Sequence, residues 1–438
     1  MEWTTTLGLL LGGILGLMAL GVPVAVAFIT VNAVGAFYLL GGDRGVAQLA
    51  RNMATSVANF AFTPIPLFVL MGEILFRTGL AIKAIDAVAL LINRVPGRLA
   101  VIALVAGTIF SAISGSTIAT TAMLGSLLLP EMLNRGYHRG IAMGPIMAIG
   151  GVDMLIPPSG LAVLLGGLAG IAIADLLIAG IIPGLILSLV FIAYIILRAW
   201  LDPSLAPSAE GAILPGWQRW KPFILHVLPL IVIIGLVIGS MVLGWATPTE
   251  SAAVGCATTA VLAACYRQLT WSAVKQALTG TAAITGLIMF IILGATTFSQ
   301  ILAFSGATGG LIQLVTEARL SATVVIVGML VILLFLGLFI DQASIMMLTV
   351  PLFMPLIAQF KVDTVWFGIL FLMCMQIGLL TPPFGLLLFT MKAVAPPEIS
   401  MTDVIRAAVP YVIFGLILTV ILLFVPGIAT WLPRALGR

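Results

Sequence analysis

Long apolar stretches separated by short polar connections run along almost the whole chain. The first two, Leu7 to Leu20 and Pro23 to Leu40, are followed by a short polar link that contains Asp43 and Arg51. A third stretch extends from Met53 to Phe76 and is interrupted early by two prolines. Because a membrane-spanning helix needs about 20 mainly apolar residues, the pattern predicts about ten to twelve spans together with some re-entrant segments.

Two of the apolar stretches are interrupted by a pair of adjacent prolines. Gly150 to Gly160 reads GGVDMLIPPSG, and Met375 to Gly385 reads MQIGLLTPPFG. Proline has no backbone N–H and pushes the preceding residue out of helical geometry, so nearby carbonyl groups lose their helical partners. Irregular backbone is tolerated inside a membrane where it is packed in protein or lines a polar cavity. Both stretches are therefore predicted to be broken helices beside a binding site.

Two further stretches carry a small polar tip between apolar flanks. One contains SGSTIATT and the other contains GLFIDQASIMM. A helix, a polar tip and a returning helix form a re-entrant hairpin, which we predict over residues 99–134 and 320–358. Residues 77–98 instead space charged side chains among apolar ones, which is typical of an amphipathic helix on the membrane surface.

The second half of the chain repeats the plan of the first. Six residues recur with the same identity 225 positions later: Pro23, Pro130, Pro157, Pro158, Gly160 and Leu161 fall on Pro248, Pro355, Pro382, Pro383, Gly385 and Leu386. At the same offset the polar tip at Ser116 and Thr117 falls on Asp341 and Gln342. Six coincidences at one ungapped offset indicate an internal duplication.

The duplication predicts the orientation of the two halves. If each half has five spans and one hairpin, the second half begins on the opposite face of the membrane and lies inverted. Thirteen of the 19 Lys and Arg residues then fall on one face, which places the central linker in the cytoplasm and both termini outside. The predicted fold is an all-α polytopic membrane protein. Its parts are a first repeat (1–200), a linker (201–222), an inverted second repeat (223–438), and broken helices over 140–173 and 363–395.

Composition supports a membrane protein and excludes several other classes. Hydrophobic residues make up 62% of the chain, charged residues 8%, and the mean hydropathy is +1.27. The net charge of +4 comes from basic residues scattered between helices, which fits membrane topology better than nucleic-acid binding. Three cysteines in apolar runs are interpreted as structural thiols. The first stretch has no basic segment before it and no cleavage site, so we expect it to be retained as a span.

The polar groups at the tips and breaks predict what is bound there. Hydroxyls, an amide and a carboxylate at the tips, with unwound carbonyls near Ile156 and Thr381, are oxygen ligands that suit Na⁺. Helix N-termini at the same places suit a carboxylate. Asp341 lies deep in an apolar segment, where a charge costs about 2.5 to 3.5 kcal/mol, and this favours a ligand role. Glu73 and Glu250 are interpreted either as proton carriers or as acids that stabilise a helix or reach the membrane surface.

At this point the chain resembles a known family, the large membrane subunit of TRAP transporters, the tripartite ATP-independent periplasmic carriers. The matching motifs are SGSTIATTAMLGSLLLPEM, LIPPS, ATPTESAAVG, GLFIDQASIMMLTVP and GLLTPPFG, and they lie in this order across nearly the whole chain. The resemblance implies a Na⁺-coupled secondary transporter of organic acids in the bacterial inner membrane that works by an elevator mechanism. It also implies two partners, a small membrane subunit of about four spans and a periplasmic substrate-binding protein.

The resemblance also implies particular site residues. Two or more Na⁺ ions are expected. The first Na⁺ site would use Ser114, Gly115, Ser116, Asp153, Ile156 and Pro158, and the second would use Asp341, Gln342, Gly378, Thr381 and Pro383. The substrate would be held by Ser116, Thr117, Ser159, Asp341, Gln342 and Thr381. One position departs from the family: Asp153 stands where the family usually has a glycine and where the duplicate keeps Gly378. A carboxylate there is expected to strengthen cation binding, couple a proton or pair with another cation.

Other functions were weighed against this one. An ATP-driven pump needs a phosphate-binding loop, and the sequence has no GxxxxGK[ST] motif. An intramembrane enzyme needs a nucleophile with a base or a metal cluster, and the two histidines, His138 and His226, have no such spacing. Two hairpins that enter from opposite faces of the membrane indicate alternating access, which argues against an open channel. A stand-alone divalent-anion symporter with inverted repeats is the main alternative. Because neither tip nor break contains an arginine, the acid itself is left open among dicarboxylates, keto acids, sugar acids and zwitterions.

Overall fold

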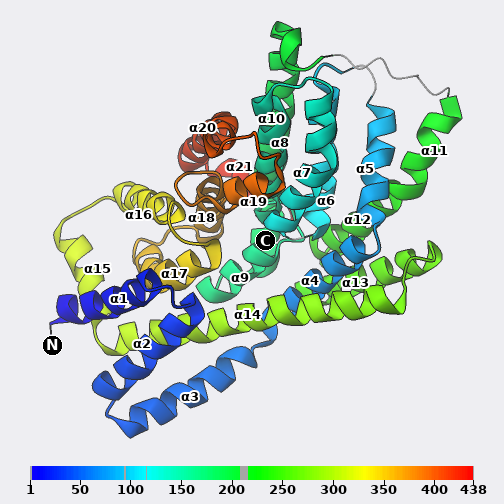
Figure 1. Cartoon of the computed structure of the whole chain (residues 1–438). Helices are drawn as coiled ribbons and strands as arrows, with labels where there is room; N and C mark the ends of the chain where they lie inside the picture. The colour runs from blue at the N-terminus through cyan, green and yellow to red at the C-terminus, as the bar shows by residue number, and fades with distance from the viewer. Residues whose placement is uncertain (1, 93–94, 115, 208–215, 438) are drawn as a thin grey trace.

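The computed structural model describes residues 2–92, 95–114, 116–207 and 216–437, and helices are the only regular secondary structure among them (Figure 1). The helices of the first half are α1 (Trp3–Ala19), α2 (Val24–Leu39), α3 (Asp43–Val57), α4 (Pro64–Arg77), α5 (Leu80–Leu91), α6 (Arg98–Ser114), α7 (Thr117–Asn134), α8 (Arg139–Gly151), α9 (Gly160–Ala169) and α10 (Ile173–Leu201). Three short 3-10 helices are η1 (Phe60–Phe62), η2 (Val152–Met154) and η3 (Pro203–Leu205).

The second half is helical in the same way. Its helices are α11 (Gly216–His226), α12 (Leu228–Val242), α13 (Pro248–Cys265), α14 (Trp271–Phe304), α15 (Ala307–Glu317), α16 (Ala322–Gly337), α17 (Gln342–Gln359), α18 (Thr364–Leu379), α19 (Leu386–Val394), α20 (Met401–Phe424) and α21 (Gly427–Ala435). The all-helical fold agrees with the sequence-based prediction. Hydrocarbon leaves no water to bond the backbone, and a helix satisfies its backbone groups internally.

The helices form two groups that meet along α14. This helix has 34 residues and runs across the lower part of Figure 1, where α2, α3 and α4 lie against it. The other group holds the hairpins α6–α7 and α16–α17, the broken helices α8–α9 and α18–α19, and the long helices α10 and α20. The two groups touch where α17 and α9 pack on α14 and where α6 and α9 pack on α4. Each group draws helices from both halves of the sequence.

Two pairs of corresponding helices begin 225 residues apart. Helices α7 and α17 both have 18 residues and begin at Thr117 and Gln342, and α8 and α18 begin at Arg139 and Thr364. Both proline pairs contain a cis peptide bond, Pro157–Pro158 and Pro382–Pro383. The relative orientation of the two halves and the limits of the repeats stay predictions.

Within the described residues, five helical segments are by themselves long and apolar enough to cross a membrane. They are 60–77, α10, α14, α17 and α20, and the bent pair α11–α12 would make a sixth. Six shorter apolar helices, among them α1, α2, α16 and α18, accompany them. The predicted number of spans, about ten to twelve, therefore stays a prediction.

Helices extend into two of the predicted connections. The polar link after the second span and the start of the third form one separate amphipathic helix, α3. The chain then turns through η1, where the Asn59 side chain accepts from Ala61 N at 3.0 Å, and α4 begins at Pro64. Proline is favoured at this first position because its missing N–H has no helical partner there. In the predicted linker, α10 continues to Leu201 and α11 begins at Gly216, within the stretch expected to be a linker.

The first break is held in place by close packing against α10. A methyl group on Gly180 would lie 2.2 Å from the carbonyl oxygen of Leu155, and one on Gly184 would lie 2.6 Å from a side-chain carbon of Ile156. Only glycine lets the unwound backbone approach α10 this closely. The second break is packed similarly, because Gly378 and Gly337 of α16 touch through their backbones.

We predict that Gly180→Ala lowers the free energy of unfolding by about 1 to 3 kcal/mol, because the added methyl group pushes α10 away from the backbone at Leu155. The matched control is Gly239→Ala in α12, where a methyl group would have no neighbour within 4 Å. Thermal melting of the detergent-solubilised protein measures both. Equal melting temperatures for the two variants would contradict the packing described here.

Candidate functional site

The first predicted tip lies between α6 and α7. Ser116 is the N-cap of α7, and its hydroxyl oxygen accepts a hydrogen bond from Ala119 N at 3.3 Å. Thr117 is the first residue of the helix and is buried. Gly115 and the side chain of Ser114 lie outside the described residues. The cap fixes the start of α7, so the N–H groups of its first turn point toward the tip.

The second predicted tip has the same construction with a charged cap. Asp341 is the N-cap of α17, and its carboxylate accepts from the backbone N–H of Ser344 at 3.2 Å and from the Ser344 hydroxyl. Gln342 begins the helix and is buried. A carboxylate at this position is stabilised by the positive end of the helix dipole.

Both tips line one cavity of about 470 Å³. Gly160 and Leu386, the first residues of α9 and α19, line it too, so four helix N-termini meet around one space. Each N-terminus carries unpaired N–H groups and about half a positive charge. The volume falls within the range of small-molecule sites. The cavity is therefore suited to a small anion.

The opposite wall of the cavity comes from α4 and α14. Ile288 and Ile291 of α14 supply apolar surface, and Glu73 and Arg77 of α4 supply an ion pair with a distance of 3.0 Å between Arg77 Nε and Glu73 Oε2. The cavity thus lies between the two helix groups. A molecule bound there contacts both groups at once.

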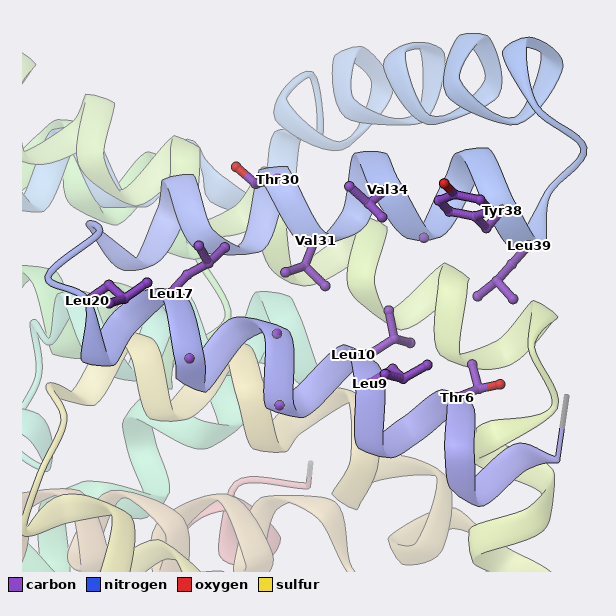
Figure 2. A pocket seen from close by; sticks show the side chains of 14 residues that line it. Thr6, Leu9, Leu10, Leu17, Leu20, Thr30, Val31, Val34, Tyr38 and Leu39 are labelled. Atoms are coloured by element: carbon purple, nitrogen blue, oxygen red, sulfur yellow. The ribbon is translucent and has the colours of Figure 1, made fainter.

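A second cavity is a poor candidate for an anion site. It has about 760 Å³ and lies between α1 and α2, where Leu10 and Val31 point into the space between the two helices (Figure 2). Its lining is apolar except for Thr6, Thr30 and Tyr38, and it contains no charged residue. Such a groove has little to offer a carboxylate, so the cavity at the tips is the better site.

Four of the six predicted substrate residues line the tip cavity: Ser116, Thr117, Asp341 and Gln342. Ser159 stands just outside it as the N-cap of α9, where its hydroxyl oxygen accepts from Ala162 N at 3.3 Å. Thr381 is not part of the lining; its hydroxyl donates to the Ile377 carbonyl at 2.7 Å.

Among the described residues predicted for the first Na⁺ site, Ser116 lies at the first tip and Asp153, Ile156 and Pro158 lie at the first break. Asp153 sits in η2 with 3% of its surface exposed, and Ile156 is buried beside α10. Both α6 and α7 contact η2, so the hairpin packs on this break. Those predicted for the second site surround the second tip and break in the same way. There, Phe384 N after the prolines donates to the carbonyl of Leu338 before the tip, at 3.0 Å.

Three buried oxygens near the first break have no hydrogen-bond partner among the described residues: Thr121 Oγ1, Asp153 Oδ1 and Gln376 Oε1. Thr121 packs against Gly150 and Gln376 against Gly151, so they flank the end of α8 just before Asp153. Buried polar atoms without partners are costly and rare in folded proteins. Cation binding is one way to satisfy such oxygens.

Sequence reasoning did not identify every residue of the site. It placed Arg77 at the start of a surface helix, yet Arg77 ends α4 and lines the cavity with Glu73. Neither tip nor break contains an arginine, as the sequence analysis states, but the wall that α4 contributes to the cavity does contain one. The available signal was the i, i+4 spacing of the two charges, but nothing in the sequence places α4 opposite the tips. Glu250 has a structural role, since its carboxylate accepts from Thr247 N at 2.7 Å in a capping box.

Comparison with known proteins adds the family to this geometry. Residues 11–428 match the family described as the DctM component of the tripartite ATP-independent periplasmic transporter. The chain belongs to this family. It is thus a large permease subunit of the TRAP transporters, a multi-pass membrane protein and a transporter component rather than an enzyme.

Curated relatives of this permease carry different substrates in their names. The C4-dicarboxylate TRAP large permease DctM of Pseudomonas aeruginosa is 32% identical over 400 residues, which cover 91% of this chain and 92% of the relative. The 2,3-diketo-L-gulonate permease YiaN of Escherichia coli is 30% identical and covers 96% of both chains. The ectoine permease TeaC of Halomonas elongata is also 30% identical, with 95% of this chain and 96% of the relative covered.

Solved structures of other transporters share the fold of this permease. The Alcanivorax borkumensis YdaH transporter superposes with a TM-score of 0.63 at 16% identity and covers 92% of this chain and 96% of its own. Neisseria gonorrhoeae MtrF has a TM-score of 0.60 at 17% identity, and the match covers 87% of this chain and 84% of MtrF. At these identities the likeness concerns the fold alone.

We predict that Ser159→Ala lowers the free energy of unfolding of the permease by about 0.5 to 2 kcal/mol, because it removes the cap that begins α9. Ser159→Thr keeps a capping hydroxyl without adding a buried charge and serves as the control. Thermal melting in detergent compares the two. If the alanine variant has the same melting temperature as the wild type, the Ser159 hydroxyl does not stabilise the start of α9.

Proposed function

We propose that this permease carries an organic acid across the inner membrane, driven by Na⁺, and that the acid binds in the cavity between the two tips. The observation that supports this most strongly is the convergence of four helix N-termini on one cavity of about 470 Å³. Oriented N–H groups and helix dipoles bind carboxylates without a dedicated basic residue. The names of the three curated relatives include a dicarboxylate, a sugar acid and a zwitterion, and each contains a carboxylate.

We propose Na⁺ as the coupling ion on the chemistry of the oxygen atoms near the tips. The Asp341 carboxylate at the second tip and the three unpartnered oxygens around the first break are hard ligands of the kind that Na⁺ sites use. No basic residue lies within either break. Two ions, one at each tip, follow from the parallel construction of the two halves.

The arrangement of the helix groups supports an elevator mechanism. The tips and breaks belong to one group, and α4 and α14 form the wall opposite them. If the group that carries the tips moved along α14, the tips and an acid bound to them would move while the wall of α4 and α14 stayed in place. We also propose that the permease works with two partners, a small membrane subunit and a periplasmic binding protein.

Uptake into proteoliposomes tests this function. A melting screen of organic acids against the partner binding protein first identifies the acid. We expect uptake of that acid only when the large subunit, the small subunit, the binding protein and an inward Na⁺ gradient are all present. Equal uptake without the binding protein would instead favour a stand-alone symporter, and uptake without Na⁺ would exclude the proposed coupling.

We predict that Asp341→Asn reduces Na⁺-driven uptake at least about tenfold, the equivalent of about 1.4 kcal/mol. Asparagine caps a helix as well as aspartate does, so the change removes the charge and leaves α17 intact. Asp363→Asn is the matched control, since Asp363 caps α18 and accepts from Val365 N at 3.0 Å but does not line the cavity. Unchanged uptake by the Asp341 variant would exclude a role in cation binding.

Asp153 offers a separate test of the first ion site. We predict that Asp153→Gly, which restores the residue found in the second half, raises the Na⁺ concentration for half-maximal uptake several-fold. The physical reason is the loss of a buried carboxylate oxygen near the ion. Uptake measured over a series of Na⁺ concentrations reports the shift, and an unchanged cation response would show that Asp153 takes no part.

A further inference from the structure

The ion pair between Glu73 and Arg77 is the feature of the cavity wall that the proposed function does not use. Arg77 Nε donates to Glu73 Oε2 at 3.0 Å, and Arg77 Nη1 donates to Gln276 Oε1 at 3.5 Å. Arg77 is the only cationic residue among the described residues that line the cavity; the other charged ones are Glu73 and Asp341. The pair is only partly exposed, with 17% of the Glu73 side chain and 35% of the Arg77 side chain accessible.

The surroundings make room for the Glu73 carboxylate. Gly280 of α14 lies next to this carboxylate. A methyl group on Gly280 would be 2.8 Å from the carboxyl carbon and from Oε2 of Glu73. The guanidinium presents five N–H donors, and the two contacts above involve only Nε and Nη1. Donors thus remain on Arg77 for another acceptor, while Glu73 holds the charge neutral when the cavity contains no anion.

The positively charged groups that line the cavity come from different elements. The helix N-termini of α7 and α17 lie on the side of the tips, and Arg77 lies on the wall formed by α4. An anion with one acidic group is satisfied at the tips. A second acidic group on the same molecule has one cationic partner in this lining, Arg77, and reaches it only in competition with Glu73.

We propose that Arg77 recognises a second anionic group of the transported acid and that Glu73 is a built-in competitor that occupies Arg77 until that group arrives. Arg77 is then a specificity-determining residue that favours acids with two anionic groups over those with one. Glu73 lowers the affinity for such acids and returns to Arg77 when the acid leaves, which aids release. This inference rests on the proposed function of the cavity and adds to it the residues that discriminate between acids.

The experiment measures binding of two radiolabelled probes, succinate and butyrate, to the large and small subunits in lipid nanodiscs containing Na⁺. The probes have the same chain length and differ in the second carboxylate. We expect the wild type to bind succinate at least about tenfold more tightly than butyrate. Arg77→Gln should abolish this preference, whereas Glu73→Gln should strengthen succinate binding several-fold and leave butyrate binding unchanged.

Two further variants keep the test decisive. The single variant Arg77→Gln leaves the Glu73 carboxylate without its partner and could misfold for that reason. The double variant Glu73→Gln with Arg77→Gln removes both charges and avoids this problem. It should also lack the preference for succinate. Arg135→Gln is the matched control, because Arg135 forms the same i, i+4 ion pair with Glu131 at 2.5 Å, away from the cavity. It should bind both probes as the wild type does.

The outcomes separate this inference from the proposed function. An unchanged preference in Arg77→Gln and in the double variant, or weaker succinate binding in Glu73→Gln, would overturn the role given to the pair while the carboxylate site stands. A wild type that binds butyrate as tightly as succinate would overturn it as well. Failure of the wild type to bind, in Na⁺, either probe or the acid identified through the binding protein would contradict the proposed function itself.

Discussion

The structure depends on one constraint, that backbone polar groups inside hydrocarbon must find partners within the protein. A helix that continues through the membrane meets this constraint without help, but α8–α9 and α18–α19 do not, because two prolines interrupt each of them. Their free N–H and carbonyl groups are acceptable only where other helices enclose them or where a polar ligand binds. The four helix starts therefore gather at one cavity, and that cavity is the functional site we propose.

Close packing of glycine makes this arrangement possible. Gly180 lets α10 approach the carbonyl of Leu155, and Gly337 and Gly378 bring the second hairpin against the second break. Each contact is backbone to backbone, so any side chain at these positions would separate the elements. These close contacts hold the polar tips in fixed positions. Packing therefore stabilises the fold, and the backbone N–H groups at the helix starts provide the binding groups for an anion.

Much of this could be predicted from the sequence, because the strongest signals are local. Proline pairs, polar tips and the offset of 225 positions drew attention to the stretches where α7 and α17 begin and where α8 and α18 end, while the limits of the repeats stay predictions. The cap residues Ser116 and Asp341 were also found, since a polar residue before an apolar helix is a recognisable start signal. Residues that reach the site from a distant helix were not. Arg77 looks unremarkable in sequence and gains its importance only from the fold, which places α4 beside the cavity; Thr121 and Gln376 lie within the predicted tip and break but were not singled out there.

The cavity joins the two helix groups, which is why its two walls differ in chemistry. The wall that carries the tips offers helix dipoles and oxygen ligands, and the wall of α4 and α14 offers apolar surface and one ion pair. The most direct test of this account is a cryo-electron microscopy structure of the complete transporter with Na⁺ and the acid identified through its binding protein. The account predicts density for the acid between Ser116 and Asp341, in contact with the first turns of α7 and α17. Density for the acid elsewhere, such as in the groove between α1 and α2, with the tip cavity empty, would contradict it.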